Sequence, residues 1–370
     1  WFFKGMATYA KGGVDLPIGF GDWYWVPSRA LPGDTITEFP FFTFTYADLH
    51  AHMIALPITL LVLGLAMAFI YNRWRKSDST KFGMGVELAV TLAFTGLILG
   101  ALKITNTWDW PTYTALTCVA IIYSVYRYAD IPTWLFPKWP EYLRKAVMIV
   151  AIIGAILGIS AVLFLPFSQN YAQAYGSIDR WQGDHSPLGS YLIHWGLPFF
   201  LIISWFGWET REWLASTPAS SLKKIQPYLV YLQVLTILFF AILILLTALG
   251  IKIGWLVGFL AGWDLILLLR PGLSDQKKIV HFLIGTGLIL TLFVEVFVLV
   301  GDVGRMNTVF KFYYQAWMLI NISAMAALMW LTPAIRTVWK ERNLAIWQLV
   351  LAILLISAYL YPMTATTDKI

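Results

Sequence analysis

The chain has 370 residues, of which 59% are hydrophobic and 12% charged, against about 45–50% and about 25% in ordinary globular domains. Its mean hydropathy of +0.69 and its 19 tryptophans, 18 tyrosines and 24 phenylalanines exclude a soluble enzyme and indicate a lipid environment. Cys118 is the only cysteine, which excludes an intrachain disulfide and a cysteine metal cage.

Residues 1–52 precede the first apolar run and are too long and too patterned for a simple connector. We expect them to be an extracytoplasmic segment leading into the membrane. Trp1 is not an initiator methionine, and no signal peptide precedes it. The sequence therefore predicts that this chain is a piece of a longer protein lacking the N-terminal part, with an upstream span outside it.

Trp23, Tyr24 and Trp25 stand beside Asp22 and Arg29 in this leading segment. Such a group can form a stacking platform for a sugar or a lipid headgroup. It is equally typical of the aromatic belts at membrane surfaces, and the belt is the favoured interpretation.

The leading segment ends in DLHAHM, in which Asp48, His50 and His52 are spaced two apart. In an extended chain all three side chains point the same way, whereas in a helix only Asp48 and His52 share a face. Asp48 and His50 are candidate catalytic groups, and His52 is a candidate phosphate ligand. A divalent metal ion at Asp48, His50 and His52 is a further hypothesis, although no fourth ligand is evident. Alternatively, Asp48 caps the following helix.

Residues 53–370 form a multi-span transmembrane domain, because apolar runs bounded by charges recur at about ten places. Backbone groups in hydrocarbon must hydrogen-bond within their own segment, so the runs are expected to be helices, and they lack the alternation of barrel strands. The fold class is therefore all-α, a polytopic transmembrane helical bundle. The third and seventh runs are the most polar. The ten runs are 53–71, 84–102, 111–129, 146–165, 190–208, 228–249, 253–269, 279–300, 316–334 and 344–361.

Lysines and arginines concentrate on one side of these spans, where 17 of the 26 lie. The positive-inside rule makes that side cytoplasmic, and we expect a multi-pass protein of the plasma membrane. Attraction of these loops to anionic lipid explains the net charge of +6 without a nucleic-acid partner, so we expect no nucleic acid to bind. The basic loops are 72–83, 130–145 with Arg127, 209–227, 270–278 and 335–343.

The opposite, outer loops hold the unusual polar clusters. The loop near 103–110 contains Trp108 and Asp109 before Pro111, a proline that suits the first turn of the next helix. Asp109 is either a candidate catalytic carboxylate or a helix cap, and Trp108 is a candidate substrate contact.

The outer loop at 166–189 is longer than ordinary connectors and carries Asp179, Arg180, Trp181, Asp184 and His185. It can act as a lid over a site or pack as a solvated loop. Arg180 is a candidate phosphate ligand.

Glu295 lies inside the eighth run, where a carboxylate is costly and usually faces a cavity or a partner. The following outer loop, 301–315, carries four polar candidates for binding phosphate or substrate, Asp302, Arg305, Asn307 and Lys311. Glu295 is a candidate catalytic group. The alternative is a buried Glu295–Arg305 pair that fixes helix register. Elsewhere, His194 and His281 are expected to be satisfied structurally, and Asp264, near a cytoplasmic end, is expected to reach the interface or a neighbouring lysine or arginine.

The motifs DLHAHM, NTWDWP at 106–111 and GDVGRMNTVFKFYYQAW at 301–317 resemble those of the YYY-domain membrane protein family. That family is grouped by similarity with the GT-C class of glycosyltransferases, and the resemblance covers most of the chain. The family's three-tyrosine segment and the first outer loop, which carries the essential carboxylate in GT-C enzymes, are absent from this sequence.

The resemblance implies a GT-C-like membrane glycosyltransferase that transfers a sugar from a polyprenyl-phosphate donor at the extracytoplasmic face. Arg305 and Lys311 would meet the phosphate, and Asp48, Asp109 or Glu295 would act as base. Membrane lipids and a polyprenyl-phosphate sugar are the expected partners. Two other hypotheses are a non-catalytic membrane subunit of a larger complex, with other membrane subunits as partners, and a transporter.

Overall fold

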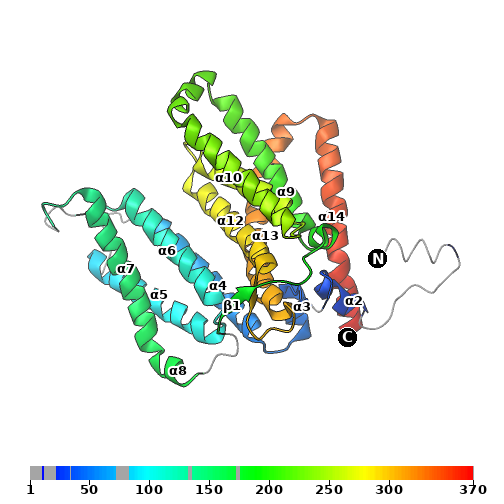
Figure 1. Ribbon diagram of the computed structural model, residues 1–370, viewed down its shortest axis with the longest axis horizontal. Coiled ribbons are helices and arrows are strands. Elements are labelled where there is room, and N and C mark those ends of the chain that lie inside the picture. The colour runs from blue at the N-terminus through cyan, green and yellow to red at the C-terminus, as the bar shows by residue number, and fades with distance from the viewer. Residues whose placement is uncertain are drawn as a thin grey trace. The chain divides into compact units, whose positions relative to one another are not determined.

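The computed structural model describes residues 11, 22–33, 35–71, 83–131, 136–171 and 176–369 (Figure 1). Most of the predicted leading segment before residue 22 and nearly all of the predicted basic loop 72–83 lie outside these residues. The chain divides into two compact units. The larger unit comprises residues 1–47 and 175–370, and the smaller unit residues 48–174.

The smaller unit is helical throughout its described residues. Helix α4 packs against α5 and α6, and α7 packs against α5 and α6. A β-carbon on Gly96 or Gly100 of α5 would lie within 3 Å of Ile159 or Phe164, respectively, so small residues permit the close α5–α7 approach. The helices are α4 (Ala51–Tyr71), α5 (Gly83–Thr105), α6 (Asp109–Tyr128), α7 (Glu141–Leu163) and α8 (Leu165–Asn170).

The larger unit consists of helices and one two-stranded sheet, β1 (Ile178–Arg180) with β2 (Phe297–Leu299). Its long helices are α9 (Leu188–Ser216), α10 (Leu229–Ala248), α11 (Gly254–Leu269), α12 (Asp275–Val296), α13 (Met306–Val338) and α14 (Glu341–Lys369). The short elements are α2 (Asp22–Trp25), α3 (Pro40–Tyr46) and the 3₁₀ helices η1 (Val26–Arg29), η2 (Ala219–Lys224) and η3 (Gln226–Tyr228).

Helix α13 is the centre of the larger unit, since α9 and α12 both pack against it; Figure 1 shows α12 and α13 side by side. Trp195 and Trp205 of α9 and Tyr313 of α13 are fully buried there. A β-carbon on Gly287 of α12 would meet the Ile320 side chain of α13 at 2.5 Å, so this glycine permits the contact. The outer end of this unit, named after the predicted orientation, is where α12 ends and α13 begins.

The opposite, inner end carries a buried charge cluster. Glu209 of α9 is 3% exposed and pairs with Arg270, which follows α11, and with Lys277 of α12, whose Nζ lies 2.6 Å from Oε1. Asp264 of α11 and His281 of α12 form a second pair, Oδ1 to Nδ1, at 2.8 Å. These pairs connect α9, α11 and α12. His281 is thus satisfied at Nδ1 only, since no described residue hydrogen-bonds its Nε2, and the same holds for Nε2 of His194. Asp264 is buried against this histidine, not against the lysine, arginine or interface expected for it.

The ten predicted spans coincide with the ten long helices of the described residues, and the all-α, polytopic fold is confirmed. Eight of the ten are long and apolar enough to cross a membrane. The two others are α6 and α11, the third and seventh predicted runs. The seventh run was expected to be among the most polar, but α11 is apolar and falls short by its length. Helix α11 has only 16 residues, and α6 has a polar first half and a low mean hydropathy.

The end of α14 packs against α2 and α3. Tyr24 is buried, stacks on Phe42 with a centroid distance of 4.8 Å, and its carbonyl accepts a hydrogen bond from the Tyr361 hydroxyl at 3.3 Å. Burial, and secondarily the nearby Glu38 carboxylate, raises the pKa of Tyr24 to about 12. Of the three clustered aromatic residues in the predicted platform, Tyr24 is thus a packing residue, whereas Trp25 is exposed and lies beside the Arg29 guanidinium.

Candidate functional site

The loop 176–187 is fastened to the outer end of α12. Strands β1 and β2 pair antiparallel, with Arg180 opposite Phe297. Beyond the strands, the Trp181 amide donates to the Val296 carbonyl at 2.8 Å and the Val300 amide donates to the Ser177 carbonyl at 3.0 Å. The predicted solvated loop therefore has a defined backbone position over the C-terminal turn of α12.

Glu295 holds the end of this loop. Its side chain is fully buried, and both carboxylate oxygens accept hydrogen bonds from Ser186: Oε2 from the amide at 2.9 Å and Oε1 from the hydroxyl at 2.5 Å. Oε1 also accepts a hydrogen bond from Arg305 Nη1 at 2.8 Å. The two residues Glu295 and Arg305, weighed in the sequence as a register-fixing pair, are thus in direct contact.

Arg305 closes the network from the N-terminal end of α13. It is 4% exposed; Nη1 also donates to the Val294 carbonyl at 3.0 Å, and Nη2 donates to the Ser186 hydroxyl at 3.0 Å. The guanidinium lies 5.5 Å from the centroid of the Trp181 ring. A buried ion pair is tolerated when its remaining donors and acceptors are satisfied in this way.

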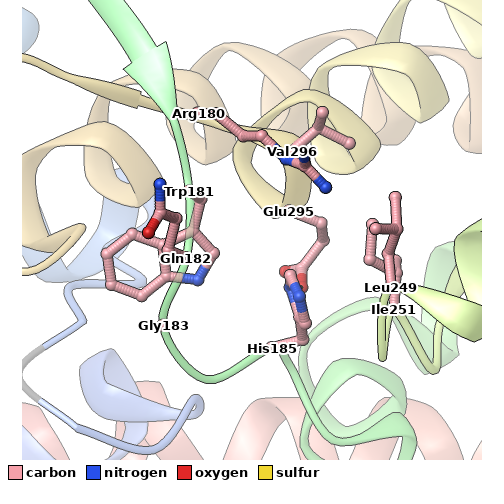
Figure 2. Close-up of a pocket in the computed structure, with 9 residues that line it drawn as sticks. All are labelled: Arg180, Trp181, Gln182, Gly183, His185, Leu249, Ile251, Glu295 and Val296. Carbon is pink, nitrogen blue, oxygen red and sulfur yellow. The ribbon is translucent and has the colours of Figure 1, made fainter.

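A pocket with a volume of about 410 Å³ opens beside this network, a size typical of small-molecule sites. Figure 2 shows the Glu295 carboxylate pointing toward the His185 imidazole, with Leu249 and Ile251 on one side and Trp181 on the other. The lining is Arg180, Trp181, Gln182, Gly183, His185, Leu249, Ile251, Glu295 and Val296. It combines one exposed cation, one indole and one imidazole with an apolar wall.

His185 lines the pocket beside Glu295. Its Nδ1 is buried, lies 3.4 Å from Glu295 Oε2, and has no hydrogen-bond partner in the described part of the chain. Its side chain is 14% exposed. From the sequence, His185 was assigned only to a candidate lid, and Ser186 was assigned to no site. Their contacts with Glu295 could not be recognised, because each joins residues that are more than 100 positions apart in the chain.

Asp302, Asn307 and Thr308 form the start of α13. The Asp302 carboxylate accepts hydrogen bonds from the amides of Asn307 at 3.1 Å and Thr308 at 2.7 Å, and from both side chains, at 3.0 and 2.7 Å. This is the arrangement of a helix cap. Lys311 lies one turn further along α13 and is half-buried. Neither Asp302, Asn307 nor Lys311 lines the described pocket.

Asp48, His50 and His52 belong to the smaller unit. His50 Nε2 lies 2.7 Å from Asp48 Oδ2, with both side chains more than half exposed. His52 is buried in the first turn of α4, and its ring stacks on that of His50 at a centroid distance of 5.4 Å. Among the described residues there is no cluster of three histidine, cysteine, aspartate or glutamate side chains that could hold a metal ion, so this trio does not form one.

Trp108 and Asp109 also belong to the smaller unit. Asp109 is the first residue of α6 and is buried, and its amide donates to the Asn106 carbonyl at 3.1 Å. Lys103 lies over the ring of the neighbouring Trp110, 5.4 Å from its centroid. Thus the structure brings Glu295, Arg305 and Arg180 to one place in the larger unit, and the remaining candidates to the α13 cap or the smaller unit.

Comparison with known proteins shows which family the chain belongs to and no more specific relationship. No curated protein matches the chain, and no solved structure matches it. The family model described as "Uncharacterized membrane protein (DUF2298)" matches residues 3–320. A match of that extent, together with the helices of spanning length, identifies the chain as a member of this family of multi-span membrane proteins.

Proposed function

We propose that this protein is a GT-C-like membrane glycosyltransferase that binds a polyprenyl-phosphate sugar at the outer-end pocket and transfers the sugar there. The observation that carries the proposal is the composition of the pocket. It places a guanidinium, an indole and an apolar wall around one opening, at the end of the larger unit opposite its basic loops.

Arg180 is the residue best suited to the donor phosphate. It is exposed, lines the pocket, and forms no ion pair with any described residue. A guanidinium binds phosphate oxygens through paired N–H donors. Arg305, the cation favoured by the sequence, already donates to Glu295, Val294 and Ser186. In this proposal Arg305 therefore supports the site, and Arg180 binds the ligand.

Trp181 and the apolar wall of the pocket opposite it are suited to the parts of the donor other than its phosphate. The indole Nε1 donates to the Asp184 carbonyl at 3.1 Å, which fixes the ring beside the opening. Aromatic rings with an apolar face and a fixed edge are common contacts for ligands of mixed polarity. Leu249, Ile251 and Val296 supply apolar surface for the first part of a polyprenyl chain.

The donor test uses the full chain in lipid nanodiscs with polyprenyl-phosphate mannose and polyprenyl-phosphate glucose. Release of polyprenyl phosphate and binding of the intact donor are measured by mass spectrometry. We expect Arg180→Gln to weaken donor binding about 10- to 100-fold, the loss typical of one charged hydrogen-bonding group. Lys252→Gln, an exposed cation on the neighbouring turn, is the matched control and should change binding less than about 2-fold. Absence of donor binding by the unmodified protein, or equal effects of both variants, would refute the proposal.

The proposed site faces away from the cytoplasm. In a Cys118→Ser background, Asp184→Cys at the outer end and Lys223→Cys in η2 at the other end are both exposed positions. A membrane-impermeant maleimide added to intact cells should label Asp184→Cys and leave Lys223→Cys unlabelled until the cells are opened. The reverse pattern would place the pocket in the cytoplasm.

A non-catalytic membrane subunit is the second candidate, and the Glu295 network favours it. Ser186 and Arg305 already satisfy both oxygens of that carboxylate, as in a structural pair. This candidate predicts copurification with other membrane proteins at a fixed ratio, measured by native mass spectrometry, and unchanged association after Arg180→Gln.

A further inference from the structure

His185 has the position of a proton-accepting group at the pocket. One ring nitrogen, Nδ1, is buried and faces the Glu295 carboxylate at 3.4 Å. The other, Nε2, has no hydrogen bond to a described residue, and the Cδ2–Nε2 edge of the ring lies beside Gly250. The ring lines the pocket and its side chain is 14% exposed. A histidine that faces a buried carboxylate on the wall of a pocket is a recurring arrangement for general base catalysis.

The carboxylate that orients His185 is itself fixed from three directions. The Ser186 amide and hydroxyl hold both of its oxygens, and Arg305 holds Oε1. Because Ser186 directly follows His185, the same contacts fix the backbone that carries the imidazole. Glu295 therefore cannot turn toward a ligand without losing these bonds, whereas the His185 ring lines the pocket and makes no hydrogen bond to a described residue that it would have to give up.

We propose that His185 is the catalytic base of the outer-end pocket and that it acts on a hydroxyl group of the sugar acceptor, with Glu295 as its positioning residue. This rests on the proposed sugar transfer. It identifies the acceptor class as an alcohol, and it replaces the carboxylates favoured by the sequence with a histidine.

The step balances without a further reactant. Nε2 takes the proton of the acceptor hydroxyl as the acceptor oxygen forms a bond to the anomeric carbon. The bond between that carbon and the phosphate oxygen breaks, and its electron pair leaves with the polyprenyl phosphate. The departing phosphate lies beside Arg180, and the protonated imidazole beside the Glu295 carboxylate, so both changes in charge meet an opposite charge.

The experiment compares His185→Gln and His185→Gly with Asp184→Asn, the adjacent exposed position outside the pocket lining, in nanodiscs with the donors named above and a simple alcohol acceptor. We expect both His185 variants to lose about 100-fold or more in turnover, the range for general bases, with donor binding within about 3-fold of the unmodified protein. Added imidazole should partly restore the turnover of His185→Gly, a rescue that a merely structural histidine would not show. Asp184→Asn should keep the rate of the unmodified protein.

Chemical modification of the histidines tests this inference independently of the proposed function. Diethyl pyrocarbonate should modify His185 faster than the fully buried His281, as measured by peptide mass spectrometry, whether or not transfer occurs. Transfer that persists in His185→Gln would overturn the base and leave the sugar transfer standing. Absence of transfer by the unmodified protein would overturn both. Modification of His185 no faster than His281 would show that the imidazole edge is closed, which also overturns the base.

Discussion

The two ends of the larger unit each bury a glutamate against an arginine, and they differ in what surrounds the pair. At the inner end, Glu209 of α9 pairs with both Arg270, which follows α11, and Lys277, in the first turn of α12. At the outer end, Glu295 takes one cation, and a loop residue, Ser186, supplies the other hydrogen bonds. The inner carboxylate joins helices to one another, whereas the outer one joins helices to a loop.

At the inner end, both side chains that bind the carboxylate are cations, no pocket is described beside them, and the Lys277 side chain is 30% exposed. At the outer end, an imidazole and a cavity lie against the same carboxylate. Burying a charge within a membrane protein is energetically costly, so the groups that surround each carboxylate indicate the role in which that carboxylate is kept.

The largest expected loss of stability follows removal of the outer cation. Arg305→Met leaves the fully buried Glu295 carboxylate with Ser186 alone, which should reduce the free energy of unfolding by about 3–5 kcal/mol. Reversible unfolding in detergent measures it. Arg180→Met, an exposed arginine at the same end, should change it by less than about 0.5 kcal/mol. The Glu295→Gln and Arg305→Met double variant should recover part of the loss, and equal losses for Arg305→Met and Arg180→Met would contradict a buried charge pair.

The inner end should be less sensitive. Glu209→Gln leaves two cations, but Lys277 reaches solvent and Arg270 keeps its hydrogen bond to the Glu209 carbonyl. We expect a loss of about 1–3 kcal/mol, measured by the same unfolding titration. Glu212→Gln, whose exposed side chain pairs with the adjacent Arg211, is the control and should be nearly neutral. A loss for Glu209→Gln above that of Arg305→Met would reverse the comparison.

A smaller effect is expected at the α13 cap of the outer end. Asp302→Ala removes the acceptor for the amides of Asn307 and Thr308, which should cost about 1 kcal/mol. Hydrogen exchange should accelerate at these two amides, and Asp179→Ala on the exposed strand β1 is the control. Unchanged exchange at both amides would mean that Asp302 does not cap the helix.

The smallest effect at neutral pH is expected for Tyr24→Phe, which removes one hydroxyl from the aromatic packing at the outer end. The pKa of Tyr24 is about 12 in the folded protein and about 10 in an unfolded chain. Its contribution to stability is therefore complete below pH 10 and is lost as the pH rises toward 12. Tyr24→Phe should decline less steeply over this interval in an alkaline unfolding series. Tyr171→Phe, at an exposed position, serves for comparison, and identical slopes for the two variants would argue against burial of the Tyr24 phenol.

Helix positions could be predicted from the sequence because apolar runs and helices coincide in this chain. The run at 253–269 corresponds to α11, Gly254–Leu269. The run at 316–334 marks only part of α13, which begins at Met306. There, Asn307, Lys311 and Gln315 interrupt the hydropathy, although the backbone is helical and Gln315 is buried.

The site could be predicted only in part. Glu295 and Arg305 are ten residues apart, so their pairing could be anticipated from the chain itself. His185 and Ser186 approach Glu295 across more than 100 residues, through the pairing of β1 with β2. Three-residue strands have no periodicity that a sequence can reveal. The pocket therefore depends on tertiary contacts that no local pattern records.

The strand pair and the Ser186–Glu295 contact have a joint consequence for ligand exchange. Both fasten the 176–187 loop to the same element, the last turn of α12 and the strand that continues it. Lifting the loop as a lid would require several hydrogen bonds to break together, which is a local unfolding event. On the proposed function, the loop would act as a fixed wall of the pocket, so a donor would have to fit the opening as it stands and would be selected by size there before any transfer.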